Sequence, residues 1–208
     1  MNVHGILSVG LLALFAAAIT PAHADVITFD TAPLSSSSGF TGSVVEGLYL
    51  YSVSSGTLDV AAHGNPGQDM QGFYPASNGS QNGVLTITRT DGGTFKFGSM
   101  DVAVVSTAAG GGIGYSVYGT LNGAYAASGG GGGAASTTYN YASWSSIDTS
   151  AVLDTVQITL QASTTDDNHV YVAIDNVTLT NVSPVPEPAT MAVLAVGIAG
   201  LAAARRRA

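Results

Sequence analysis

Residues 85–97 read LTITRTDGGTFKF, and this stretch decides the fold. Leu85 and Ile87 alternate with threonines, and Phe95 and Phe97 flank a lysine. Alternation with period two is typical of a β-strand with one buried face. The Asp-Gly-Gly triplet between the two alternating runs is a strong signal for a tight turn. The stretch therefore predicts a β-hairpin.

The same periodicity recurs on both sides of this hairpin. Past Gly98 the apolar phase shifts by one residue, to Met100 and Val102, which indicates a bulge. No stretch between the termini shows a sustained 3.6-residue apolar period. The further strands that we expect cover residues 26–29, 44–53, 113–121, 137–147, 156–160 and 170–179. Eight to ten short strands separated by Gly, Ser and Asn predict an antiparallel β-sandwich.

Two glycine-rich patches lie within this series, at residues 110–112 and 129–133. A loop that cradles phosphate needs spaced glycines between a strand and a helix, and neither patch has that context. We therefore expect both patches to be flexible hairpin loops.

The charge balance excludes several classes of partner. The chain has 208 residues and a formal net charge of −8. Three of its basic residues end the chain, so the body between residues 25 and 184 holds only Arg89 and Lys96 against twelve acidic side chains. Such a body does not suit nucleic acid or anionic lipid, since both need a basic face. The chain has no cysteine, which excludes disulfides and thiol chemistry.

The C-terminus carries a three-part pattern. Val185-Pro186-Glu187-Pro188 precedes an uncharged apolar run at residues 189–204, and Arg205, Arg206 and Arg207 follow it. A helix over this run would cover roughly 24 Å, against a hydrocarbon core of about 30 Å, and twenty residues counted from Val185 suffice for a short span. The arginines should stay in the cytoplasm and place the body outside. A plain tail anchor is the alternative.

This pattern resembles the PEP-CTERM sorting signal of Gram-negative bacteria that make exopolysaccharide. The matching parts are Pro186-Glu187-Pro188, the apolar run and the arginine cluster. The resemblance implies that an exosortase, a membrane protease-transpeptidase, cuts near Val185–Pro188 and delivers the protein to the cell surface or the medium. It covers about the last 24 residues and implies nothing direct about the body.

The N-terminus predicts export as well. Residues 5–19 are an apolar run, and Ala22-His23-Ala24 forms a cleavage signature after Pro21. We expect a signal peptide over residues 1–24, a sandwich domain over 25–184 and the sorting signal over 185–208. The segment before the run lacks Lys and Arg, so an uncleaved anchor is the alternative.

A polar pair interrupts the last strand of the body. Asp175-Asn176 lies inside Ile174–Leu179, where burial is costly unless the pair is bound. The segment resembles the last strand of jelly-roll modules, many of them carbohydrate-binding, in which a similar Asp helps to ligate a structural calcium near the first strand. The resemblance implies a calcium site at Asp30 and Asp175, completed by carbonyl oxygens. A bulge in which Asp175 caps backbone amides is the alternative.

Other polar and aromatic residues suggest weaker sites. Residues 166–169 (Asp-Asp-Asn-His) and the loop 63–69 are typical of turns, although the loop could contact a ligand. Nine tyrosines and one tryptophan offer aromatic faces, and Trp144 is the sugar-stacking candidate. No signature of a hydrolase occurs. A pair of carboxylates does not by itself indicate a glycosidase here, because the twelve acidic residues of the body always offer some such pair.

These observations lead to an expected function. We expect a non-enzymatic surface or matrix protein with a structural or adhesive role in exopolysaccharide or biofilm. A carbohydrate-binding module braced by calcium is the first alternative, and an extracellular hydrolase is the second.

Overall fold

The computed structural model describes residues 24–35, 39–64, 67–72, 79–106, 112–145, 147–165 and 168–183. In this part of the chain the regular structure is entirely β. The strands are β1 (Ala24–Ile27), β2 (Phe40–Glu46), β3 (Tyr49–Gly64), β4 (Gly67–Gly72), β5 (Gly79–Arg89), β6 (Thr94–Ser106), β7 (Gly112–Leu121), β8 (Ala124–Ala134), β9 (Ala142–Trp144), β10 (Thr155–Thr165) and β11 (Asn168–Ser183).

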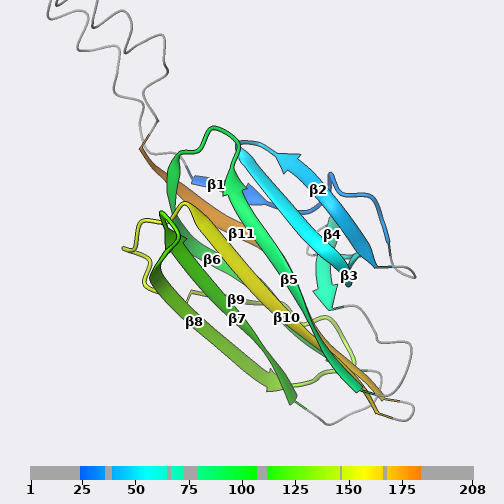
Figure 1. The fold of residues 1–208 in the computed structure, drawn as a ribbon. Helices are drawn as coiled ribbons and strands as arrows, with labels where there is room; N and C mark the ends of the chain where they lie inside the picture. The colour runs from blue at the N-terminus through cyan, green and yellow to red at the C-terminus, as the bar shows by residue number, and fades with distance from the viewer. Residues whose placement is uncertain are drawn as a thin grey trace, which may run out of the picture. The chain divides into compact units, whose positions relative to one another are not determined.

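The strands form an antiparallel β-sandwich, as the alternating pattern predicts. The strand order is β8-β7-β10-β5-β3-β4-β11-β6-β9, with β2 added on β3 and β1 on β11. Figure 1 shows β2, β3, β5, β10, β7 and β8 in front of β1, β11, β6 and β9. The long strand β3 joins the layers, because its first half pairs with β5 and its second half with β4.

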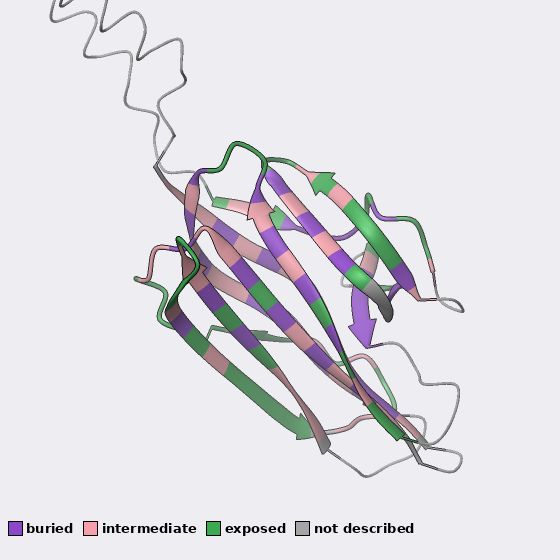
Figure 2. Cartoon of the chain, viewed as in Figure 1, coloured by how far each residue is buried: buried purple, intermediate pink, exposed green. Residues whose placement is uncertain are grey.

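The main core lies between the layers. It is built from alternate residues of the strands, which Figure 2 shows as purple bands along β3, β5 and β10. Tyr49, Tyr51, Leu85, Ile87 and Phe97 are fully buried in it. Burying a side chain of this size stabilises the fold by about 1.5–3 kcal/mol.

The turn at Asp91–Gly93 exists, but the hairpin prediction was wrong in its pairing. β5 pairs with β3 and β10, whereas β6 lies between β11 and β9, so the chain crosses from one layer to the other. The physical reason is that Leu85, Ile87, Phe95 and Phe97 are all buried and face one core from opposite sides. The predicted change of phase after Gly98 is present, since Phe95 and Phe97 are buried and then Met100 and Val102.

Three further sequence predictions were wrong in detail. The strand expected over residues 44–53 is the end of β2, a turn at Gly47-Leu48, and the start of β3; Gly47 has φ 61°, a conformation that favours glycine. The strand expected over 137–147 is only the three residues of β9. The loop expected over 129–133 is part of strand β8, where the glycines pair with β7 over residues 113–117.

Candidate functional site

The candidate site lies on the side of β4 and β11 that faces away from the main core. Met70 of β4 and Ile174 of β11 belong to that core, so their neighbours along each strand point to the opposite side. Asp69 and Gln71 are nevertheless buried, with 0% and 4% exposed, and Tyr171 is buried beside them at 4%. Buried polar side chains on an outer sheet face need a cover and hydrogen-bond partners.

Tyr139 and Tyr141, from the connection between β8 and β9, provide this cover. The Tyr141 hydroxyl donates to Asp69 Oδ2 at 2.6 Å, and the Tyr139 hydroxyl donates to Gln71 Oε1 at 3.0 Å. The Tyr139 hydroxyl also contacts the Tyr171 hydroxyl. Both rings pack on a small apolar cluster that includes Ala103, Val105 and Ala162. Buried hydrogen bonds thus fix the orientation of both rings.

His63, near the end of β3, extends this arrangement to the surface. Its imidazole stacks on the Tyr139 ring, with centroids 4.3 Å apart and an interplanar angle of 15°. Tyr139 in turn stacks with Tyr141 at 6.2 Å and 25°. The His63 side chain is 46% exposed, so the stack ends in an accessible ring. We call His63, Asp69, Gln71, Tyr139, Tyr141 and Tyr171 the Asp69 cluster.

The Asp69 carboxylate lies in an unusual electrostatic environment. Its Oδ1 is buried, and no described residue hydrogen-bonds to it. His63 Nδ1 is 3.9 Å from that oxygen, and burial lowers the His63 pKa, which disfavours the imidazolium. Burial and, more weakly, the Asp175 charge raise the pKa of Asp69 to about 6, against the lowering effect of hydrogen bonds from the Tyr141 hydroxyl and the His63 backbone. Burial likewise raises the Tyr141 pKa above its usual range.

Asp175 is the second acid of this face. The register of β4 and β11 pairs Gln71 with Ala173 and Met70 with Ile174. Asp175 follows Ile174 on β11, and its charge raises the pKa of Asp69, so the two carboxyl groups disfavour each other's ionised form. Asp175 is 0% exposed.

The structure also shows the bulge that was the alternative for Asp175. Asn176 has φ 49°, in the left-handed region, and its amide donates to Asp175 Oδ1 at 2.7 Å. The buried phase of β11 changes at this point, from Val172 and Ile174 to Val177 and Leu179. Asp175 and Asn176 therefore both lie outside the core, and the extra residue returns Val177 to it.

Asp30 lies beside the same β3–β4 hairpin. Its Oδ1 accepts a hydrogen bond from the Gln68 amide at 2.8 Å, and its carboxylate packs against Gly67, where a Cβ would overlap it. On Gly64, a Cβ would lie 2.9 Å from Asp175 Oδ2 and also meet the Gln68 carbonyl. Carbonyl and carboxylate oxygens are what calcium binds. The described residues, however, contain no group of three or more His, Cys, Asp or Glu that could hold a metal. Calcium at Asp30 and Asp175 stays a prediction.

Trp144 contacts the core. It is half-buried on β9, and its ring meets Phe97 and Tyr115 edge-on, with centroids 6.1 and 5.3 Å apart. These contacts supply packing, and its sugar-stacking role stays a prediction. Asp166 and Asp167 lie outside the described residues, as do the sorting residues Val185–Pro188 and Arg205–Arg207.

Sequence reasoning missed the centre of this site. Asp69 was assigned to a polar loop, and the tyrosines that cover it are about 70 positions further along the chain. The one local signal was Asp69-Met70-Gln71, a polar–apolar–polar alternation between Gly67 and Gly72. That alternation is typical of a short strand with a polar outer face.

Comparison with known proteins identifies the C-terminal segment. Residues 184–207 match the PEP-CTERM protein-sorting motif. No curated protein matches the chain. A family 29 carbohydrate-binding module from Piromyces equi superposes with a TM-score of 0.41 at 10% identity, over 79% of this chain and 93% of that one. A family 11 module from Clostridium thermocellum gives 0.38 at 12%, over 79% and 99%. At these TM-scores the likeness is loose.

The sorting motif indicates where the protein is delivered. PEP-CTERM proteins are exported and sorted to the cell surface or the extracellular space, and the motif implies processing by an exosortase. The predicted membrane span at residues 189–204 lies outside the described residues. In the part of the chain that the structure describes, no helix has the length and hydropathy to cross a bilayer.

Proposed function

We propose that this exported chain is a surface or extracellular-matrix protein with a structural, adhesive role in exopolysaccharide or biofilm. We further propose that its sandwich binds polysaccharide at the Asp69 cluster. The sorting motif at residues 184–207 is the observation that carries the proposal, because it delivers the sandwich to the place where such polymers accumulate.

The ring stack supports the choice of a saccharide as ligand. Sugar rings present apolar C–H faces that pack on aromatic rings, while their hydroxyls need polar partners. The exposed imidazole of His63 offers such a face at the end of the stack. Hydrogen bonds to Asp69 and Gln71 hold the tyrosines behind it in place. A ring that is already fixed loses little entropy when a ligand binds.

Binding suits this site better than hydrolysis. A glycosidase needs two carboxyl groups that reach the scissile bond. Asp69 and Asp175 are both fully buried, beneath the rings in the case of Asp69. Because both carboxyl groups are buried, neither can reach a substrate. Asp69 affects the ligand only through the ring that it positions.

The test is calorimetric titration of the protein with soluble fragments of its host's exopolysaccharide. His63→Ala removes the accessible ring, and we expect affinity to fall about 2- to 10-fold, since a ring contact contributes about 0.5–1.5 kcal/mol. Tyr118→Ala is the matched control, because Tyr118 of β7 is also an accessible aromatic residue, 42% exposed, and it lies outside the Asp69 cluster. Equal affinities in the parent and His63→Ala, or a loss in Tyr118→Ala alone, would contradict the site. New reducing ends would contradict a purely adhesive role.

A further inference from the structure

Four strands of the sandwich have a described neighbour on one side only. These are β1 and β2, added on β11 and β3, and the two ends of the strand order, β8 and β9. The free side of such an edge strand presents unpaired backbone N–H and C=O groups, which can pair with another extended chain. Proteins normally protect these edges with short strands, charges, prolines or bulges.

Three of the four edges carry such protection. β1 has four residues and includes Asp25, and β9 has three residues. β2 has a register shift between Phe40 and Gly42 and ends in Glu46. The Glu46 carboxylate is held by the Thr28 amide at 2.7 Å and the Thr28 hydroxyl at 2.9 Å, so a charge is fixed at this edge.

The edge of β8 lacks these features along most of its length. β8 has 11 residues with no charge and no proline. A register shift near its start, opposite Gly119–Thr120, leaves residues 127–134 in unbroken register with residues 112–119 of β7. Ser128 and residues 130–133 are exposed, and Figure 2 shows the strand mostly in green. No described residue hydrogen-bonds to its outer side.

The glycines of β8 differ in what a side chain at each position would meet. A Cβ at Gly130 would lie 2.6 Å from the Tyr115 carbonyl, and one at Gly132 would lie 2.7 Å from the Ile113 carbonyl, so pairing with β7 requires glycine at both positions. A Cβ at Gly133 would meet only Val104, at 4.0 Å. The fold of one copy therefore leaves room for a side chain at Gly133, and a substitution there tests the edge without disturbing the pairing with β7.

Charge indicates which partner fits this edge. Residues 102–147 contain no Asp, Glu, Lys or Arg, in a chain of net charge −8. Two such chains repel each other over most of their surface. The β7–β8 hairpin is a surface on which two identical acidic molecules can approach without bringing like charges together. An identical strand also matches β8 in length when the two run antiparallel.

We propose that two copies of the protein pair through β8, antiparallel about a two-fold axis. The front layers of the two sandwiches would then form one continuous sheet. The contact uses the same surface on both copies, so it closes as a dimer. The far edge of the front layer is β2, whose register shift and Glu46 oppose propagation of the sheet into a filament.

Native mass spectrometry and analytical ultracentrifugation test the proposal on the protein as an exosortase-bearing host delivers it. We expect a dimer. Ser128→Lys with Gly133→Lys places two charges on each facing strand, and the dimer should be lost at concentrations at which the parent is fully dimeric. Thr41→Lys with Ser43→Lys adds the same charge to the exposed edge strand β2 and should leave the dimer intact. Circular dichroism and thermal melting confirm that each variant folds.

A second measurement reads the geometry directly. The chain has no cysteine, so Ser128→Cys gives a single spin-label site. A dimer through β8 gives one narrow inter-label distance, which disappears when Gly133→Lys and Ala124→Lys are added. A monomeric parent protein, a dimer that survives the β8 lysines, or a dimer that the β2 lysines abolish would overturn the proposal.

Discussion

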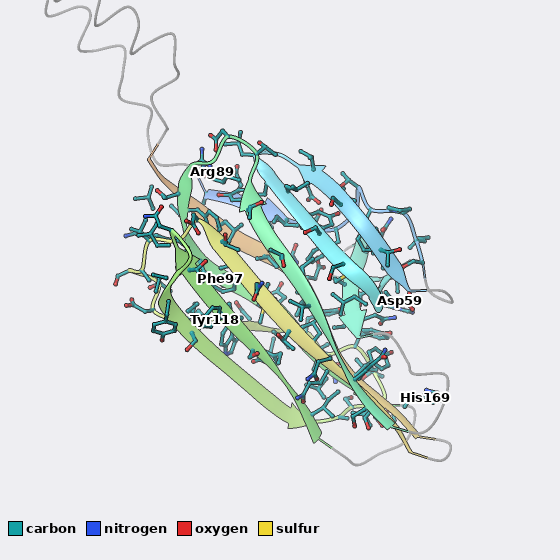
Figure 3. All side chains as sticks on the ribbon, in the orientation of Figure 1. Asp59, Arg89, Phe97, Tyr118 and His169 are labelled. Carbon is teal, nitrogen blue, oxygen red and sulfur yellow. The ribbon has the colours of Figure 1, made fainter. Side chains whose placement is uncertain are left out.

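Arg89 and Asp69 are both buried charged side chains, but they differ in how completely their charged groups are hydrogen-bonded. Arg89, labelled at the β5–β6 end of the sandwich in Figure 3, is 7% exposed and fully engaged. It donates to both Asp91 oxygens at 2.9 and 2.5 Å, to the Thr94 carbonyl and to Asn181. Asp69 has one side-chain donor, Tyr141, and a backbone hydrogen bond from His63, its Oδ1 has no hydrogen bond from a described residue, and the charge of Asp175 raises its pKa.

The difference separates a structural charge from a functional one. A buried ion with all of its partners fixes the conformation around it, as Arg89 fixes the turn that carries the chain between layers. A buried ion with missing partners costs stability, and proteins keep such groups mainly where they serve a site. The Asp69 carboxylate holds the ring stack at that cost.

The largest expected effect is at Arg89. Arg89→Met removes the four hydrogen bonds that the guanidinium donates to Asp91, the Thr94 carbonyl and Asn181, and should reduce the free energy of unfolding by about 3–5 kcal/mol, since a hydrogen bond to a charged group contributes about 1.5–3 kcal/mol. Urea denaturation measures the change. Lys96→Met removes the domain's other basic side chain, which is half-buried, and should change stability by less than about 1 kcal/mol. Equal effects of the two substitutions would remove the distinction between the two sites.

Asp69 should make the domain less stable as the pH rises. Its pKa is raised to about 6 in the folded protein, so the folded state binds a proton that the unfolded state has already released. The free energy of unfolding therefore falls between about pH 4 and pH 7, and the Asp69 carboxyl accounts for about 2–3 kcal/mol of this fall.

Asp69→Asn should flatten this fall and leave the protein more stable above pH 6. Asp154→Asn, at a half-buried acid just before β10, is the control for the pH series. Stability that rises over this pH range in the parent protein, or a variant with the parent's slope, would contradict an unsatisfied Asp69.

Calcium tests whether a cation binds beside the acidic residues of this face. We propose, from the jelly-roll resemblance, that Asp30 and Asp175 share a calcium ion. At a hundredfold excess over Kd the ion should stabilise the domain by about 2.7 kcal/mol. That corresponds to a rise in Tm of roughly 5–10 °C. Asp175→Asn should abolish most of the rise and Asp154→Asn, at a half-buried acid before β10, none of it. A Tm indifferent to calcium and chelator would leave Asp175 as the cap of its bulge.

Tyr141→Phe should have the smallest effect. It deletes the remaining side-chain donor to Asp69, and unsatisfied buried groups cost about 1–3 kcal/mol. The apparent pKa of Asp69 should also rise, because that hydrogen bond lowers it. Tyr118→Phe, on an exposed ring, is the control. An unchanged Tm and pH profile in Tyr141→Phe would show that the 2.6 Å hydrogen bond does not exist in solution.

The strands themselves were largely predictable from sequence. Period-two alternation identified much of β10 and β11, because a half-buried strand must alternate. It could not identify β8, because a run of glycines has no apolar–polar alternation and glycine has a low β-propensity. Hydrogen bonding to β7 is what makes this segment a strand. The Asp91–Gly93 turn was found, but a turn signal does not say whether the chain reverses within one sheet or between two.

The candidate site was much less predictable. Asp175 was recognised because a charge inside an apolar strand is conspicuous. Asp69 was not, because its significance lies in its partners: β11 across the register, and Tyr141 from a distant connection. Only the topology brings these segments together, and local patterns do not encode it.

The most direct test of the polysaccharide site is an NMR titration of the protein with soluble fragments of its host's exopolysaccharide, recording aromatic and backbone signals together. We expect the largest shifts at His63, Tyr139 and Tyr141, while the signals of Arg89 and its turn stay in place. Shifts centred on Tyr118 and Tyr125, shifts at the Arg89 end, or no shifts at saturating ligand would contradict it.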